Sequence, residues 1–225
     1  MDSAETVQQV LESDGFQTLS PQIKVALFLG AMTLMSAALV TMTAFTRIVI
    51  VLSFVRRALS TQEIPPTQVV LGLSMFLTLF VMGPTVTRIE QDAVRPYLSN
   101  VIDGQVAWRI SRAALHDFMI RQTRKADIAL FAKMASVTRI QTPADTPFPV
   151  LIPAYVISEL KTAFIMGFCL YIPFILIDLV VSVILMSLGM MMMPPMVIST
   201  PFKILLFVMV DGWQLISKVL GQSFH

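Results

Sequence analysis

Four long apolar runs dominate this sequence of 225 residues. They extend over residues 25–55, 69–82, 150–193 and 196–220. Runs of about 20 apolar residues are typical of helices that cross a lipid bilayer. Only 13% of the residues are charged, against about a quarter in soluble domains. The sequence therefore predicts an all-α integral membrane protein with long, kinked hydrophobic helices. It excludes an ordinary water-soluble enzyme and a disordered chain.

Proline marks the expected ends of two runs. Gly83-Pro84 is expected to end the second run, and Pro194-Pro195 separates the third from the fourth, because proline does not continue a helix. At about 1.5 Å per residue, the first run reaches roughly 46 Å and the second only about 21 Å, against a hydrocarbon core of about 30 Å. Tilt and kinks explain such a mismatch, and so does burial of the helices in a multi-chain assembly.

Charged residues gather in the segment 88–149, which holds nine of the 16 Lys and Arg residues. Apolar residues recur there at helical spacing: Val106, Ile110, Ala114 and Phe118, then Leu130 and Met134. This spacing predicts two amphipathic helices. We therefore expect a polar N-terminal segment (1–24), a first hydrophobic helical hairpin (25–87), a small helical extracytoplasmic domain (88–149) and a second hydrophobic hairpin (150–225).

The orientation in the membrane is expected from the short loops. Arg56 and Arg57 follow the first run and place the loop 56–67 in the cytoplasm. The N-terminal segment, the central domain and the C-terminus are then expected outside. Residues 1–24 lack the basic opening and short apolar core of a secretory signal. Either the first run is an uncleaved anchor or a leader is missing.

Besides Lys218 near the end of the last run, six ionisable residues lie inside the apolar runs: Arg47, Glu159, Lys161, Asp178, Lys203 and Asp211. Charges in such runs are costly and mark functional or structural sites. Because three are acids and three are bases, we expect them to neutralise one another or to reach water, rather than to form an ion relay. An antiparallel turn at Pro194-Pro195 brings Lys203 close to Asp178. Lys203 would reach Glu159 only on a neighbouring copy or through a strong kink at Pro173.

Four consecutive methionines, Met190, Met191, Met192 and Met193, precede the expected turn. Methionine is unbranched and flexible, so it fills irregular gaps. In a lone chain the four residues predict a packed hairpin tip. Around the axis of several copies they would form a soft apolar ring that closes against ions and yields to a passing chain.

Enzyme motifs are absent from the sequence. There is no Walker A loop, no dinucleotide-binding glycine motif and no nucleophile elbow. The two histidines and the single cysteine show no metal-ligand spacing. We expect no enzymatic activity, no cofactor and no metal. The net charge of +2 gives no basic surface for nucleic acid.

Six blocks of the sequence form a specific pattern. They are Met42-Thr-Ala-Phe-Thr-Arg47, Pro65-Pro-Thr-Gln-Val-Val-Leu-Gly72, Phe118-Met-Ile-Arg-Gln-Thr123, Ser158-Glu-Leu-Lys-Thr-Ala-Phe164, Leu188-Gly-Met-Met-Met-Met-Pro-Pro195 and the block from Pro201-Phe-Lys203 to Asp211-Gly-Trp213. In this order they resemble the FliP family of flagellar export proteins. The resemblance covers nearly everything after about Leu34, and the third block looks like the flagellar rather than the injectisome branch.

That resemblance implies a core subunit of the flagellar type III export gate. Several copies are expected to assemble with FliQ and FliR, close to FlhB and other basal-body proteins, in the bacterial cytoplasmic membrane. The assembly is expected to be a spiral of hairpins around a conduit for unfolded flagellar proteins. By the same resemblance, Met190 to Met193 form the channel gasket, and Glu159 and Lys203 pair between adjacent copies.

Two other functions remain open from the residues alone. An ion-coupled secondary transporter would need polar sites on broken helices and usually an internal repeat, and the sequence shows no repeat. A structural scaffold of the basal body would not line the conduit. Charge reversal at Glu159, alone and together with Lys203, tests whether the two residues pair in the oligomer. Ion leakage after replacement of the methionines by alanine tests the gasket.

Overall fold

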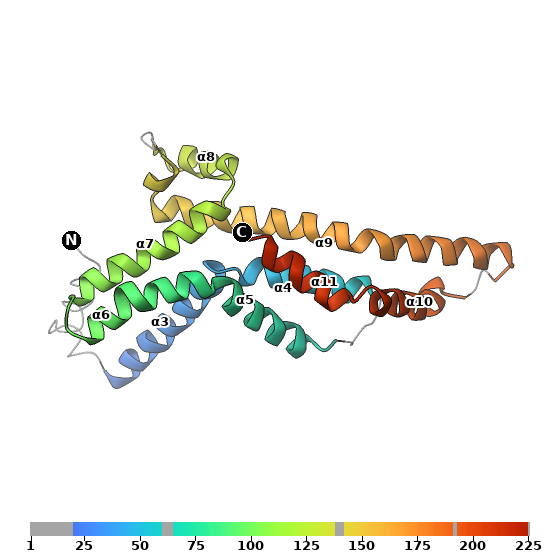
Figure 1. The fold of residues 1–225 in the computed structure, drawn as a ribbon, viewed down its shortest axis with the longest axis horizontal. Coiled ribbons are helices and arrows are strands. Elements are labelled where there is room, and N and C mark those ends of the chain that lie inside the picture. Colours follow the sequence, from blue (N-terminus) through green and yellow to red (C-terminus); the bar gives the residue numbers. More distant parts are fainter. Residues whose placement is uncertain (1–19, 60–64, 138–141, 191–192, 225) are drawn as a thin grey trace. The chain divides into compact units, whose positions relative to one another are not determined.

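The computed structural model describes residues 20–59, 65–137, 142–190 and 193–224. All regular structure within them is helical, which confirms the all-α prediction (Figure 1). The chain forms two compact units: unit 1 contains Met1–Thr43 and Met82–Tyr155, and unit 2 contains Ala44–Val81 and Val156–His225. Unit 1 includes the whole of the polar segment 88–149.

The helices formed by the first two apolar runs differ in their ends from the prediction. The first is divided at residues 42–44 into α3 (Pro21–Thr41) and α4 (Phe45–Ala58). The second forms α5 (Thr67–Ile89), which continues through Gly83-Pro84, so the predicted end there is wrong. Pro84 removes one hydrogen bond of a 23-residue helix, and the remaining bonds outweigh that loss. At about 1.5 Å per residue, α5 measures roughly 35 Å, which is long enough to cross a hydrocarbon core of about 30 Å.

The third run is one long helix and the fourth is divided. Helix α9 (Phe148–Ser187) has 40 residues and runs without interruption through Pro173. Helix α10 (Pro195–Met209) and helix α11 (Gly212–Gln222) are bent by 63° relative to each other. Asp211 lies at the bend in the left-handed region, with φ of 49°. A residue in that conformation ends the helical hydrogen-bonding pattern even though no proline is present.

By length and composition, two helical segments among the described residues are suited to cross a bilayer. They are Thr67–Leu98 and Phe148–Ser187, and the bent pair of α10 and α11 is a third candidate if it counts as one span. These segments support the prediction of an integral membrane protein. The arrangement as two hairpins stays a prediction.

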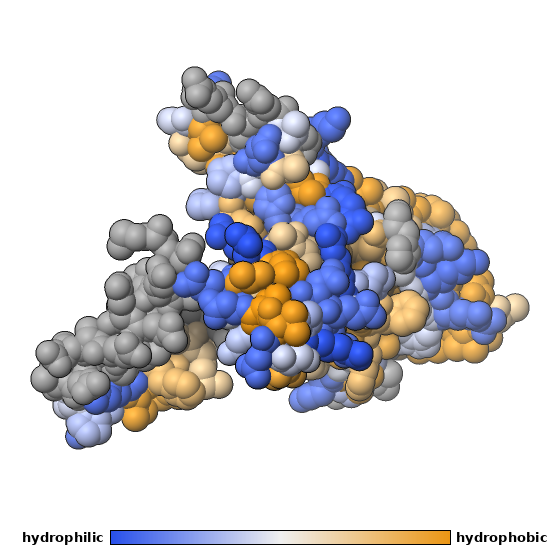
Figure 2. Space-filling view, turned by 60° about the vertical axis from the view of Figure 1, so that its left-hand side comes forward, coloured by the Kyte–Doolittle hydropathy of each residue, from blue (hydrophilic) through white to orange (hydrophobic). Residues whose placement is uncertain are grey.

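In unit 1 the polar segment 88–149 forms several helices and helical turns after α5. A π-helical turn, η1 (Glu90–Val94), leads into α6 (Arg95–Leu98), followed by α7 (Gly104–Gln122), α8 (Lys125–Met134) and the turn η2 (Pro143–Asp145). Helices α7 and α8 are the two amphipathic helices predicted from the spacing. Asp103 caps α7, because its carboxylate accepts a hydrogen bond from the Gly104 amide over 2.7 Å. Figure 2 shows hydrophilic residues over much of the face turned forward, with a hydrophobic patch among them.

The core of unit 1 forms where α7 packs on the beginning of α9. The rings of Phe118 and Tyr155 lie 6.2 Å apart, and Tyr155 is completely buried. Its hydroxyl donates a hydrogen bond to the Thr43 carbonyl over 2.9 Å. His116 of α7 is partly buried, with its ring against Phe148 and its Nε2 2.8 Å from the Thr146 carbonyl.

The core of unit 2 forms along α9. Helix α4 buries one face, made of Ile48, Val51, Leu52 and Val55. Phe54 of α4 meets Phe164 of α9 edge-to-face at 5.6 Å. Gly167 lies directly under the Phe54 ring, where a Cβ atom would overlap it. This close approach requires a glycine.

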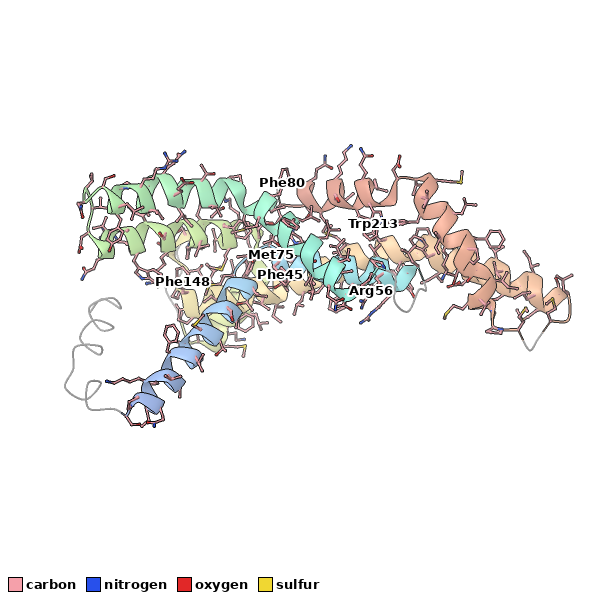
Figure 3. The ribbon with its side chains drawn as sticks, turned by 90° about the horizontal axis from the view of Figure 1, so that it is seen from below. Phe45, Arg56, Met75, Phe80, Phe148 and Trp213 are labelled. Atoms are coloured by element: carbon pink, nitrogen blue, oxygen red, sulfur yellow. The ribbon has the colours of Figure 1, made fainter. Side chains whose placement is uncertain are left out.

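Aromatic residues connect α9, α10 and α11 within unit 2. Phe207 of α10 lies 6.5 Å from Phe174 of α9 and 5.2 Å from Trp213 at the beginning of α11. Trp213 is labelled in Figure 3. A Cβ atom at Gly212 would overlap the Phe207 ring. At this bend the Phe207 ring therefore packs directly against Gly212.

Candidate functional site: buried ion pairs among the apolar helices

Arg47 of α4 and Glu159 of α9 form a buried ion pair in unit 2. The guanidinium donates from Nε to Oε2 over 2.7 Å and from Nη2 to Oε1 over 2.5 Å. Arg47 is 2% exposed and Glu159 is 0% exposed. Two charges are costly to remove from water, and a bidentate arrangement is the geometry that best offsets this cost.

Two residues after α11 cover the same guanidinium. Arg47 donates from Nη1 to the Ser223 carbonyl over 2.7 Å and to the Ser223 hydroxyl over 3.1 Å. The Phe224 ring centroid lies 3.8 Å from Cζ of Arg47, a cation–π distance. Arg47 therefore connects α4, α9 and the segment that follows α11.

A second ion pair joins α9 to α10. Lys203 donates from Nζ to Oδ2 of Asp178 over 2.6 Å, and the Ser199 hydroxyl donates to Oδ1 over 2.5 Å. Lys203 is 1% exposed, whereas the Asp178 side chain is 36% exposed. The Asp178 carboxylate thus neutralises a buried ammonium group while part of its own surface stays exposed to solvent.

The structure brings together four of the six ionisable residues predicted from the apolar runs. Lys203 meets Asp178 where a turn at Pro194-Pro195 predicts it. Glu159 meets Arg47 of the same chain. The pairing of Glu159 with Lys203 between copies concerns an assembly and stays a prediction.

The other two ionisable residues, Lys161 and Asp211, are exposed. Neither has an ion pair or a side-chain hydrogen bond within the part of the chain that the structure describes. Asp211 precedes α11, and its side chain makes no capping hydrogen bond.

The predicted gasket is only partly described. Met190 is 42% exposed and Met193 is 43% exposed, and both lie in the turn between α9 and α10. Met191 and Met192 lie outside the described residues. Gly189 has φ of 73°, a conformation that favours glycine, and Pro195 is the first residue of α10.

Sequence reasoning missed three residues of these sites. Ser199 lies four residues before Lys203 on α10, so helical spacing places both on one face and could have indicated their shared partner. Ser223 and Phe224 carry no such signal, because their contact with Arg47 spans 176 residues. No group of three or more His, Cys, Asp or Glu residues in the described ranges could hold a metal ion.

Known proteins with similar sequences cover most of this chain. The sequence profile of the FliP family matches residues 28–220. The flagellar biosynthetic protein FliP of Pectobacterium carotovorum subsp. carotovorum is 50% identical over 212 residues, which cover 94% of this chain and 82% of the relative. FliP of Bacillus subtilis is 47% identical over 215 residues, which cover 96% of this chain and 97% of the relative. FliP of Aquifex aeolicus is 42% identical over 213 residues, which cover 94% of this chain and 89% of the relative.

These matches include α4, α9 and α10, the helices that carry both ion pairs. They also include the two segments that are suited to cross a bilayer. The chain therefore belongs to the FliP family of flagellar biosynthetic proteins, which implies a role in flagellar export.

Proposed function

We propose that this chain is a core, non-enzymatic subunit of the flagellar type III export gate. Several copies assemble with FliQ and FliR into a channel that passes unfolded flagellar proteins across the cytoplasmic membrane. The channel belongs to the flagellar basal body and contacts FlhB. Family membership supports the role in export, and the apolar surface of α9 supports the assembly.

The observation that carries this proposal is the length of α9. Its 40 residues measure about 60 Å, twice the hydrocarbon thickness of about 30 Å. Large apolar residues stay more than 40% exposed along it, namely Ile157, Phe164, Phe168, Ile172, Leu179 and Val183. A bilayer covers about half of that length. Neighbouring protein chains are the remaining apolar surroundings, which is the environment that a gate of several subunits provides.

The proposed orientation places the polar segment 88–149 outside the cytoplasm. Arg56 and Arg57 lie in the last turn of α4, and the positive-inside tendency assigns them to the cytoplasmic side. The turn between α9 and α10 then faces the cytoplasmic end of the gate. Cysteines introduced at Arg57 and at Leu98 test this, because a membrane-impermeant thiol reagent added outside should label only the second. The reverse pattern would invert the orientation.

We propose that Met190 to Met193 line the narrowest part of the conduit. Flexible thioether side chains from several copies seal against ions and move aside for a translocating chain. Replacing all four with alanine should raise ion leakage while export persists. The matched control is Met186→Ala, an equally apolar residue of α9 outside the turn, 58% exposed. Unchanged leakage in the fourfold variant would assign the methionines to packing instead.

Pairing of Glu159 with Lys203 between adjacent copies is proposed for the assembled gate. It requires a change of partner, since Arg47 holds Glu159 and Asp178 holds Lys203 within one chain. Glu159→Lys should reduce the amount of assembled gate, and the addition of Lys203→Glu should restore it. Disruption by both single changes without recovery in the double variant would count against this contact.

The decisive experiment for the whole proposal is a mass measurement of the detergent-purified complex after co-expression with FliQ and FliR. A gate subunit is expected to appear in several copies together with both partners. A monomer that binds neither would overturn the proposal. A complex that contains both, but whose methionine turn never cross-links to an arrested export substrate, would instead indicate a scaffold beside the conduit.

A further inference from the structure

The charges inside the apolar helices are only partly neutralised within one chain. Arg47 pairs with Glu159, and Lys203 pairs with Asp178. Of the six ionisable residues predicted as sites, one base, Lys161, and one acid, Asp211, remain exposed without an ion pair among the described residues. These two charges are opposite in sign.

Each of the two charges lies in an exposed apolar surface. Lys161 lies on a lengthwise strip of α9 formed by Ile157, Phe164, Ile165 and Phe168, all at least 42% exposed. Asp211 lies among Val208, Met209, Val210 and Trp213, all at least 41% exposed. An unpaired charge in such surroundings is costly, so each site favours a partner of opposite charge.

The two charges are too far apart to meet within one chain. Lys203 is level with Asp178, and Asp178 lies 17 residues, or about 26 Å, along α9 from Lys161. From Lys203 the chain returns eight residues, or about 12 Å, to Asp211. Asp211 therefore stays about 14 Å short of Lys161 along α9, which is beyond the combined reach of the two side chains.

We propose that Lys161 of one copy pairs with Asp211 of a second copy, in the contact that copies make while both in-chain ion pairs are closed. This inference rests on the multi-copy assembly of the proposed function. It describes a different register from the Glu159–Lys203 contact. When Lys161 of one copy is level with Asp211 of the other, Glu159 and Lys203 of the two copies stay about 15 Å apart.

A second copy fits the chemistry of both sites better than lipid does. A lipid phosphate would neutralise Lys161 but would repel Asp211 and leave its carboxylate without a partner. Neighbouring copies supply an acid for the base on one side, a base for the acid on the other side, and an apolar surface around each charge.

The test is reversal of each charge in the full-length chain. Lys161→Asp and Asp211→Lys should each lower self-association about tenfold or more, as measured by native mass spectrometry at fixed protein and detergent concentrations. The double variant should return to within about threefold of the unaltered chain. Lys218→Asp, a reversal at another exposed lysine of unit 2, is the matched control and should change little. Circular dichroism of every variant checks that its helices are intact.

A second measurement locates the contact itself. In chains with Cys169 replaced by serine, Lys161→Cys in one tagged copy and Asp211→Cys in a differently tagged copy should form a disulfide between copies. When Lys218→Cys replaces Asp211→Cys in the second copy, no disulfide between copies should form. Single variants that associate normally would overturn the pairing. So would a double variant that stays impaired, or a loss at Lys161 that anionic lipid alone reverses.

Failure of this inference is distinguishable from failure of the proposed function. If the unaltered chain does not self-associate and binds neither FliQ nor FliR, the proposed function fails. If it assembles normally while both reversals have no effect, only the pairing of Lys161 with Asp211 fails.

Discussion

Nζ of Lys203 lies 2.6 Å from Oδ2 of Asp178, so a lysine that is 1% exposed has its countercharge on the facing helix. The Asp178 side chain is 36% exposed, and its other oxygen accepts a hydrogen bond from Ser199. Removing the acid would leave an ammonium group buried among apolar side chains. Removing both charges would leave no buried ammonium group without a countercharge.

Asp178→Asn should therefore destabilise the chain by about 2 kcal/mol, which is less than the roughly 3 to 5 kcal/mol of a fully buried pair because Asp178 is partly exposed. Asp178→Asn combined with Lys203→Met should recover most of this loss. Denaturant titration of the detergent-solubilised protein measures both. Glu90→Gln, which breaks the exposed pair with Arg95, should cost less than about 0.5 kcal/mol. Equal losses at the two sites would contradict the role of burial.

Phe224→Ala should destabilise unit 2 by about 2 kcal/mol, because it removes a ring that is 8% exposed and stacked on the Arg47 guanidinium. Thermal unfolding followed by circular dichroism measures the change. Phe76→Ala on α5 removes a ring that is 73% exposed, and should shift stability by less than about 0.5 kcal/mol. If Phe224→Leu retains less stability than Phe224→Ala, the ring is not packed as described.

Gly212→Ala should cost about 1 to 3 kcal/mol, since the new Cβ atom would overlap the Phe207 ring and displace it from Trp213. The fluorescence of Trp213 should change with it. Gly221→Ala is the matched control in the same helix, because nothing lies within 4 Å of its Cβ position. That change should stabilise α11 by up to about 1 kcal/mol. Two glycine changes with the same sign would argue against the tight bend.

Tyr155→Phe should cost about 1 kcal/mol, because it removes the hydrogen bond from a fully buried hydroxyl to the Thr43 carbonyl. Tyr97→Phe removes a hydroxyl from a residue that is 50% exposed and should have no measurable effect. Chemical denaturation distinguishes them. An unchanged midpoint in the Tyr155 variant would mean that water replaces the missing donor.

Composition and apolar periodicity were enough to predict the helical class, the membrane character and the two amphipathic helices of unit 1. Helix ends were harder to predict. Gly83-Pro84 predicts a helix end, yet α5 continues through Pro84. Helix α9 likewise continues through Pro173, which lies inside the third predicted run. In a long apolar helix, one missing hydrogen bond does not outweigh the others. The real break at Asp211 arises from a left-handed residue and the packing of Phe207, neither of which a residue pattern indicates.

The charged residues of the candidate site were identifiable from the sequence because their apolar context makes them conspicuous. Their partners were only partly predictable. The Lys203–Asp178 pair follows from counting residues on either side of a turn. Arg47 and Glu159 lie 112 residues apart in the sequence, and no local sequence pattern predicts a contact over that separation. Contacts of that span depend on how the helices pack.

The separation of Arg47 from its partners also affects how the protein is made. Ribosomes add about 5 to 20 residues per second, so Arg47 exists for about 6 to 22 seconds before Glu159 is synthesised, 112 residues later. During that interval its guanidinium has no carboxylate, and a long cationic side chain then turns toward the aqueous boundary. Arg47 of α4 therefore reaches its final contacts only after α9 and the residues that follow α11 have been synthesised.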